Sequence, residues 1–370
     1  MVDLQGQYAK IKSAVDGAIQ EVIDQSAFIN GPQVKQFCSA LENYLSVKHV
    51  IPCANGTDAL QIAMMALDLQ PGDEVITTSY TYVATCEVIA LLKLTPVFIE
   101  VNPSTFTMDP NAIEKAITSR TKAIVPVHLY GQCADMEEIL EIAKKHNLYV
   151  IEDTAQAIGA QYSFSDGRVA AAGCMGDIGT TSFFPSKNLG CYGDGGAIFT
   201  NDDALAEKLR MVANHGQKVR YYHDIVGVNS RLDTIQAAIL NCKLPHLDEY
   251  SAARRAVADR YDQAFENHPN LKTPSRNPKS THVFHQYTLT CCNIRREDLQ
   301  DYLKSKGIPT MIYYPLPVHL QKGYTQSKFE PGSLAMTEVL CQNVISLPIH
   351  TEMRPEVQEY IIQHVLNFFN

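Results

Sequence analysis

The chain has 370 residues, 45% of them hydrophobic, which is enough for one large domain and a smaller one. Its formal net charge is −9 and its 31 lysines and arginines are scattered, so it offers no cationic face for nucleic acid or a membrane surface. The ten cysteines show no metal-ligand spacing with histidine, so we predict reduced thiols and no metal site. No apolar signal segment starts the sequence, and a cytoplasmic protein is expected.

Short apolar runs alternate with helical patterns between residues 52 and 214. This alternation predicts an α/β fold with a mainly parallel sheet covered by helices. The predicted strands are Glu74–Thr78, Pro96–Val101, Ala123–Val127, Tyr149–Asp153 and Ala197–Thr200.

Helices are predicted between these strands from caps and apolar stripes. An apolar helix is predicted over residues 59–67. Asp135 followed by Glu138 is typical of a capped helix start, and Asp202 with Asp203 is predicted to start another helix. The apolar stripes of these helices are expected to form the core.

The pattern changes after about residue 245. A long helix is predicted around Arg254–Phe265, a strand over Val283–Cys291 and a helix over Glu297–Lys306. We therefore predict a large α/β domain over residues 1–245, with an N-terminal helical segment, and a smaller α+β domain over residues 246–370. No flexible linker separates them, so firm packing is expected.

Gly56 and Thr57 open the first of the predicted helices, just after a short strand. A helix start has free backbone N–H groups and a positive dipole end, and both suit a phosphate. Thr57 or Asp58 could instead cap the helix, so this pair alone leaves both interpretations open.

Asp153 ends a predicted strand, at the edge where ligands collect in an open α/β sheet. A carboxylate there can pair with the protonated nitrogen of a pyridoxal ring and keep that ring electron-poor. A turn aspartate that caps the next segment is the alternative.

Lys187 lies on a tight loop within Ser182–Gly196, after an apolar strand. A proline and several glycines shape this loop and allow backbone to approach closely. An amine in this setting is typical of a lysine that forms a Schiff base. Because Lys187, Asp153 and the Gly56–Thr57 pair follow strands of one sheet, they are expected to meet at its edge.

A series of motifs runs along nearly the whole chain. They are Phe28–Pro32, Asn55–Leu60, Pro71–Val75, Thr81–Thr85, Pro126–Gly131, Glu152–Gln156, Ser182–Gly196, Val228–Asp233 and Tyr313–Pro317. In this order they resemble the DegT/DnrJ/StrS family of pyridoxal-phosphate-dependent sugar-nucleotide aminotransferases. The resemblance implies the fold-type I architecture of aspartate aminotransferase, pyridoxal 5′-phosphate (PLP, cycling with its pyridoxamine form) as cofactor, and a homodimer with active sites between the subunits.

The resemblance also implies roles for single positions. Lys187 would form the Schiff base, Asp153 would bind the pyridine nitrogen, and Gln156 would lie near the ring hydroxyl. The other expected cofactor-binding residues are Tyr82 on a ring face, Gly56, Thr57 and Ser182 at the phosphate, and Asn229 from the partner subunit. Arg231 is expected near the carboxylate of the amino donor or of an acidic sugar.

The substrate-side residues differ from the family pattern at one point. Relatives often have His-Tyr-Pro where this chain has Tyr313, Tyr314 and Pro315, so Tyr314 is expected to bind substrate while a histidine's role has no counterpart. Lys218 and Arg220 lie in a loop rich in aromatic residues and are candidate ligands of a nucleotide diphosphate. A solvated loop is the alternative.

Residues 182–202 and 215–233 look most similar to the family members that aminate UDP-2-acetamido-2-deoxy-3-oxo-glucuronate. This similarity implies amino transfer from L-glutamate to a 3-oxo uronate sugar, with 2-oxoglutarate released, for surface polysaccharide synthesis. A 4-oxo-6-deoxy sugar aminotransferase of the GDP-perosamine type is the alternative within the class. A sugar dehydratase, in which histidine replaces the lysine, and a silent regulatory relative are the alternatives outside it.

Overall fold

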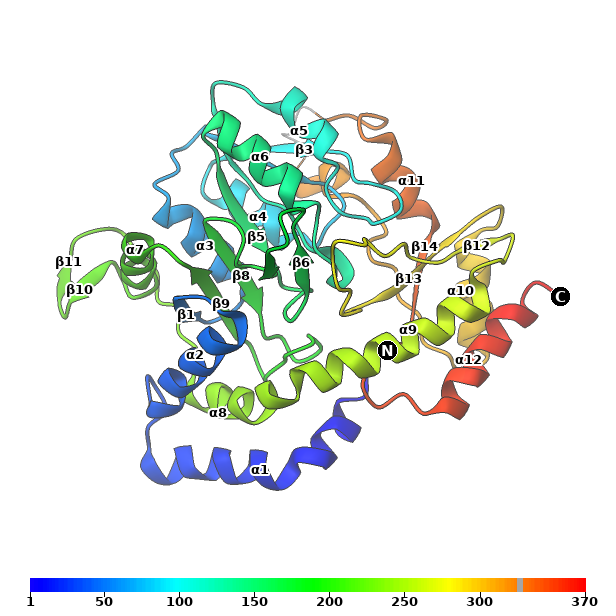
Figure 1. The fold of residues 1–370 in the computed structure, drawn as a ribbon, viewed down its shortest axis with the longest axis horizontal. Coiled ribbons are helices and arrows are strands. Elements are labelled where there is room, and N and C mark those ends of the chain that lie inside the picture. The colour runs from blue at the N-terminus through cyan, green and yellow to red at the C-terminus, as the bar shows by residue number, and fades with distance from the viewer. Residues whose placement is uncertain (325–328) are drawn as a thin grey trace.

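A seven-stranded sheet forms the centre of the computed structural model, which describes residues 1–324 and 329–370 (Figure 1). Its strand order is β1-β9-β8-β5-β4-β2-β3. These strands are β1 (His49–Cys53), β2 (Glu74–Thr78), β3 (Thr95–Ile99), β4 (Thr121–Ile124), β5 (Tyr149–Asp153), β8 (Ile178–Ser182) and β9 (Gly196–Thr200). From β8 to β3 all neighbours are parallel, whereas β9 is antiparallel to both β1 and β8. The mainly parallel sheet predicted from the sequence is confirmed.

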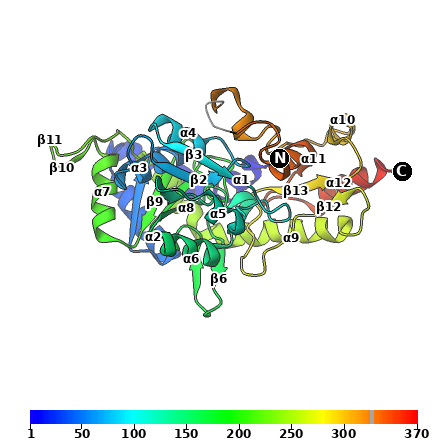
Figure 2. The same cartoon turned by 90° about the horizontal axis from the view of Figure 1, so that it is seen from above.

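Helices cover both faces of this sheet. In chain order the α-helices of the described residues are α1 (Leu4–Gln25), α2 (Pro32–Leu45), α3 (Gly56–Ala66), α4 (Ala84–Leu91), α5 (Pro110–Ala116), α6 (Met136–His146), α7 (Asp203–Ala213), α8 (Thr234–Lys243), α9 (Leu247–Phe265), α10 (Arg296–Ser305), α11 (Ala335–Asn343) and α12 (Pro355–Asn367). Of these, α3 to α7 cover the large sheet. Successive strand residues point to opposite faces, so Val75 and Ile151 pack with α3, α4 and α7, while Ile76 and Val150 pack with α5 and α6. Figure 2 shows α3 and α4 on one side of the strands and α6 on the other.

The predicted helix caps have mixed outcomes. Asp202 caps α7 as expected, because its Oδ1 accepts a hydrogen bond from Leu205 N at 2.8 Å. Asp135 precedes α6 but its side chain does not cap that helix. Its Oδ1 instead accepts from Asn277 Nδ2 at 2.7 Å, so a long-range contact replaces the predicted local one.

A smaller antiparallel sheet lies beyond α9. Its strands are β12 (Leu271–Lys272), β13 (Tyr287–Cys291) and β14 (Val344–Leu347), and they share a core with α9, α10 and α12. The long helix α9 leads from α8 to this second sheet (Figure 1). The predicted strand over 283–291 is wrong in its first half, since β13 begins only at Tyr287. The domain boundary near residue 245 stays a prediction.

Two short hairpins complete the described chain. One pairs β6 (Gln161–Ser163) with β7 (Val169–Ala171), and the other pairs β10 (Gln217–Val219) with β11 (Tyr222–His223). The β10–β11 hairpin projects beyond α7 at one end of the molecule (Figures 1 and 2). Among the described residues, no helix is both long and apolar enough to cross a bilayer.

Candidate active site

A cavity of about 680 Å³ lies at the edge of the sheet where β1, β5 and β8 end. The register places Ser182 beside Gly196 and Gly196 beside Cys53, so the C-terminal ends of β8 and β1 lie at the same edge. Eight of the predicted site residues line the cavity. They are Gly56, Thr57, Tyr82, Asp153, Gln156, Ser182, Lys187 and Tyr314.

Asp153 places a carboxylate at the cavity wall with only 6% of the residue exposed. Its Oδ2 accepts a hydrogen bond from Thr85 Oγ1 at 2.8 Å, and its Oδ1 accepts one from Ala155 N at 3.1 Å. Both donors are neutral, so they orient the carboxylate without cancelling its charge. A cationic ring nitrogen in the cavity would therefore find an oriented and uncompensated anion.

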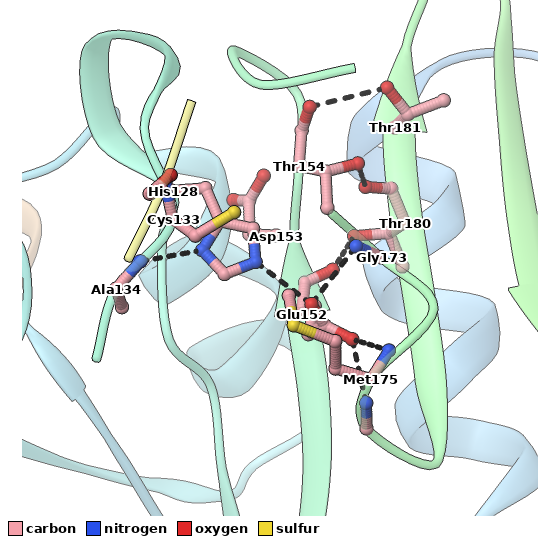
Figure 3. Close-up of polar contacts among 12 residues, drawn as sticks. His128, Cys133, Ala134, Glu152, Asp153, Thr154, Gly173, Met175, Thr180 and Thr181 are labelled. Carbon is pink, nitrogen blue, oxygen red and sulfur yellow. Dashed lines mark hydrogen bonds and ion pairs between the residues drawn. The ribbon is translucent and has the colours of Figure 1, made fainter. Parts of the chain in front are cut away.

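The strand end that carries Asp153 is anchored from behind by the buried carboxylate of Glu152 (Figure 3). Glu152 Oε2 accepts from His128 Nε2 and from Gly173 N, both at 2.9 Å, and its Oε1 accepts from Met175 N at 2.7 Å. The other ring nitrogen of His128 accepts from Ala134 N at 3.1 Å, so His128 is a neutral imidazole that donates to Glu152. His128 is thus a buried histidine with both ring nitrogens hydrogen-bonded within the fold.

Lys187 lies on a loop that folds back on itself. Its backbone N donates to Phe184 O at 2.8 Å, and Lys243 Nζ donates to Gly190 O at 2.6 Å. A Cβ at Gly190 would lie 2.4 Å from Pro185 O, so only glycine fits this closure. Burial lowers the pKa of Lys187 to about 8, and the charge of Asp153 opposes that change.

Gly56, Thr57 and Ser182 form a cradle at the start of α3. The first-turn amides of an α-helix have no acceptor within the helix, so the amides of Gly56 and Thr57 are open to an anion. A Cβ at Gly56 would lie 2.7 Å from Ser182 Cβ, which shows how closely the two backbones approach. The helix is capped by Asn55, whose Oδ1 accepts from Asp58 N at 2.8 Å, so the alternative of a cap by Thr57 or Asp58 does not hold.

Gln156 and Tyr314 join the large sheet to the segment that follows α10. Gln156 Nε2 donates to Tyr314 Oη at 3.1 Å, and Gln156 Oε1 accepts from Tyr130 N at 2.8 Å. Burial raises the pKa of Tyr314, so its hydroxyl stays protonated. The ring of Tyr82 lies 6.4 Å from that of Tyr314 and is 59% exposed, which leaves an aromatic face open at the cavity.

Four predicted residues do not reach this cavity within one chain. Asn229 is exposed and Arg231 is partly buried, and neither lines the cavity. Lys218 is exposed and forms an ion pair with Glu207 on α7, while Arg220 lies over the ring of its neighbour, 4.9 Å from the ring centroid. The roles predicted for these residues stay predictions.

Sequence reasoning assigned no site role to one residue behind the cavity wall, Thr85, or to the lining pair His285 and Gln286. Thr85 orients Asp153 and lies in the Thr81–Thr85 motif, but no role was assigned to it. His285 and Gln286 line the cavity from a segment predicted to be a strand. Their only sequence signal is the polar pair itself within an apolar run, which is weak evidence for a site.

Comparison with known proteins finds one family across nearly the whole chain. The model of the DegT/DnrJ/EryC1/StrS aminotransferase family matches residues 9–366. A solved DegT/DnrJ/EryC1/StrS aminotransferase from Brucella abortus superposes with a TM-score of 0.94 at 40% identity, covering 99% of this chain and 98% of that one. NtdA from Bacillus subtilis, solved with bound cofactor PMP, has a TM-score of 0.90 at 34% identity, covering 97% and 82%.

Curated relatives of similar length carry different names. UDP-2-acetamido-2-deoxy-3-oxo-D-glucuronate aminotransferase of Pseudomonas aeruginosa is 47% identical over 94% of this chain and 94% of its own length. A pleiotropic regulatory protein of Geobacillus stearothermophilus is 46% identical over 100% and 98%. GDP-perosamine synthase of Caulobacter vibrioides is 40% identical over 86% and 85%. These similarities identify the family of the chain more sharply than the sugar on which it acts.

Proposed function

The chain belongs to the DegT/DnrJ/EryC1/StrS aminotransferase family, and we propose that it transfers the amino group of L-glutamate to a nucleotide-linked 3-oxo sugar of the UDP-2-acetamido-2-deoxy-3-oxo-glucuronate type. The observation that carries the proposal is the meeting of Lys187, Asp153 and the Gly56–Ser182 cradle around one cavity. The 47% identity to an aminotransferase of that name supports the choice of sugar. The product would feed surface polysaccharide synthesis in the cytoplasm.

The cofactor is PLP, and the residues present fit it. The cradle at the start of α3 would hold the phosphate, Asp153 would hold the pyridine nitrogen, and Tyr82 would cover a ring face. When bound, PLP supplies an electron-poor ring that accepts the electron pair left by removal of a proton from carbon. All of these residues except Tyr82 lie on elements of the large sheet that packing fixes in place.

Lys187 Nζ would carry the proton that is removed from one carbon and given to another during amino transfer. A lysine with a pKa of about 8 is uncharged in a far larger share of molecules at neutral pH than an exposed lysine is. The free amine can therefore take the proton from the α-carbon of L-glutamate, and in the second half of the reaction the ammonium form would give a proton to the sugar carbon that receives nitrogen. Thr85 and Ala155 hold the Asp153 carboxylate in a fixed orientation through their hydrogen bonds.

We further propose that two copies of the chain complete each active site. Asn229, Arg231 and the β10–β11 hairpin with Lys218 and Arg220 lie outside the cavity of their own chain. Val219, at the end of β10, is 60% exposed, an apolar surface suited to a partner. In a homodimer these groups would supply the cations for a nucleotide diphosphate and for a carboxylate.

The first test is spectroscopic. PLP added to the purified protein should give a visible absorbance band that shifts on addition of L-glutamate, and Lys187→Ala should lose the band. The exposed Lys35 gives a matched control, since Lys35→Ala should keep both. Absence of a glutamate-sensitive band would reject the proposal and favour a regulatory protein or a dehydratase.

The second test concerns the sugar. With L-glutamate as donor, the UDP-linked 3-oxo uronate should be turned over faster than 4-oxo-6-deoxy nucleotide sugars. Turnover of a GDP-linked 4-oxo sugar alone would replace the proposed substrate with that of a perosamine-type enzyme.

A further inference from the structure

His285 and Gln286 bring two unused polar atoms to the active-site cavity. His285 is 8% exposed and its Nδ1 is fully buried, yet no partner for this atom is found within the described residues. Gln286 Oε1 is likewise buried without a partner. An unpaired buried polar atom costs about 1–3 kcal/mol, so an atom that lines a cavity in this state is expected to have a partner during function.

The backbone around His285 is held by hydrogen bonds to other parts of the fold. His285 N donates to Tyr130 O at 2.8 Å, and Val283 N donates to Gly131 O at 2.8 Å. Arg254 Nη1, from α9, donates to Phe284 O at 3.1 Å. These contacts hold the backbone that carries the imidazole, and none of them uses its Nδ1.

The same segment is tied to the Lys187 loop. Asn188 Nδ2 donates to Val283 O at 2.9 Å, so the residue after Lys187 is joined to the segment that carries His285. Lys187 and His285 both line the cavity, and a lysine side chain has a long flexible stem. Lys187, Asp153 and His285 thus line one cavity, and the charge of Lys187 acts on His285 as that of Asp153 acts on Lys187.

The charges around His285 keep its ring neutral. Burial lowers its pKa well below the usual value, and the positive charges of Lys187 and Arg254 lower it further. The pKa of Lys187 is itself lowered by burial and raised by Asp153. Between these two groups the proton therefore resides on Lys187, and the imidazole is left with a nitrogen that can accept a hydrogen bond.

We propose that His285 is a positioning residue for Lys187, accepting a hydrogen bond from the Lys187 ammonium group through Nδ1 whenever that group is not bonded to the cofactor. The proposal rests on the proposed function, in which Lys187 carries the transferred proton. His285 would give the ammonium group a neutral acceptor that does not take its proton. The ammonium group would therefore stay oriented until it returns the proton.

The test measures the protonation of Lys187 directly. In the full-length protein without cofactor, the rate at which an amine reagent modifies Lys187 is followed against pH by mass spectrometry of its peptide. His285→Leu removes the acceptor, so the ammonium form is weakened and the midpoint should fall by about one pH unit. His285→Asn keeps an amide oxygen near the place of Nδ1 and should leave the midpoint close to that of the unchanged protein.

Equal midpoints for His285→Leu and the unchanged protein would overturn the proposal, as would equal shifts for the Leu and Asn variants, which would indicate packing alone. If His285→Leu does not fold, ¹⁵N NMR of the imidazole in the unchanged protein decides. The ring should stay neutral from about pH 5 to pH 9, and its Nδ1 shift should change in Lys187→Met. A titration near the usual histidine pKa, or an unaltered Nδ1 shift, would reject the proposal.

These readouts separate the failure of this inference from failure of the proposed function. If the protein binds PLP and responds to glutamate, but the pH midpoint of Lys187 modification is the same with and without His285, the proposed function stands and the positioning role of His285 is rejected. A binding site for a sugar hydroxyl at His285 would then be indicated if His285→Leu raised KM for the sugar and left the Lys187 midpoint unchanged.

Discussion

The cavity at the ends of β1, β5 and β8 and the β10–β11 hairpin differ in how completely one chain builds them. At the cavity, Asp153 is oriented by two donors and the Lys187 loop is closed by its own backbone. On the hairpin, Lys218 and Arg220 are exposed and contact only nearby parts of their own chain. Under the proposed function, most of the residues that hold the cofactor lie within one subunit, whereas Lys218 and Arg220 would bind the sugar nucleotide only where two subunits meet.

The largest effect is expected inside the subunit, at Asp153. Asp153→Asn keeps the shape of the side chain but removes its charge, and kcat should fall by about 10²–10³. Asp194 also lines the cavity but is exposed, so Asp194→Asn is the matched control and should change kcat little. Similar losses in both variants would indicate that general charge, and not the pairing at Asp153, matters.

The next prediction tests whether Asn229 acts in the cavity of the partner subunit. If Asn229 acts in the partner's cavity, Asn229→Ala should be nearly inactive by itself, as should Lys187→Ala. Chains of the two variants, unfolded and refolded together, should regain part of the activity, because some mixed dimers hold one site with no substitution. Mixtures that stay inactive would place Asn229 and Lys187 in the same subunit's site.

A smaller effect is expected in the phosphate cradle. Gly56→Ala adds a Cβ that would lie 2.7 Å from Ser182 Cβ, and the resulting displacement should weaken PLP binding about tenfold. Gly17→Ala on α1 is the control, because its Cβ would meet nothing within 4 Å and binding should be unchanged. Fluorescence titration of the cofactor-free protein with PLP measures both, and equal affinities would argue against a phosphate at this cradle.

The last prediction concerns how the free energy of unfolding depends on pH. Lys187 has a pKa of about 8 in the fold against 10.5 normally, so between these values the unfolded chain binds more protons and stability rises with pH. Below pH 8 the folded state carries the full free-energy cost of burying the Lys187 amine. Cofactor-free Lys187→Met should therefore be more stable by about 3 kcal/mol at pH 7, with a difference that shrinks as pH approaches 10.5.

Urea unfolding at several pH values checks this prediction. The exposed Lys35 provides the control, since Lys35→Met should show no such pH dependence. A stability difference for Lys187→Met that stays constant over the range would mean that packing, and not the buried amine, is responsible.

Local patterns were enough for the elements that carry the cofactor residues. The strands ending at Thr78 and Asp153 begin and end as predicted, because buried parallel strands are short apolar runs that the sequence displays openly. The motif around Lys187 likewise indicated its loop, since proline and glycine restrict a backbone locally.

Local patterns failed where distant segments compete for the same groups. Asp135 precedes α6, yet its side chain accepts a hydrogen bond from Asn277. At the start of α3, Asn55 is the cap, whereas Thr57 and Asp58 were the candidates considered from the sequence. Neither choice can be read from the neighbouring residues, because each depends on which donor the tertiary fold brings closest.

By itself, the sequence determined the class of fold, the cofactor and the residues at the strand ends, since hydrophobic periodicity, loop glycines and family motifs are local properties. Only the tertiary structure decided that residues 283–286 leave the strand pattern and bring His285 to Lys187. The physical reason is that the backbone groups of this segment donate to Tyr130 and Gly131 and accept from Arg254, all far away in the sequence, instead of pairing with a neighbouring strand.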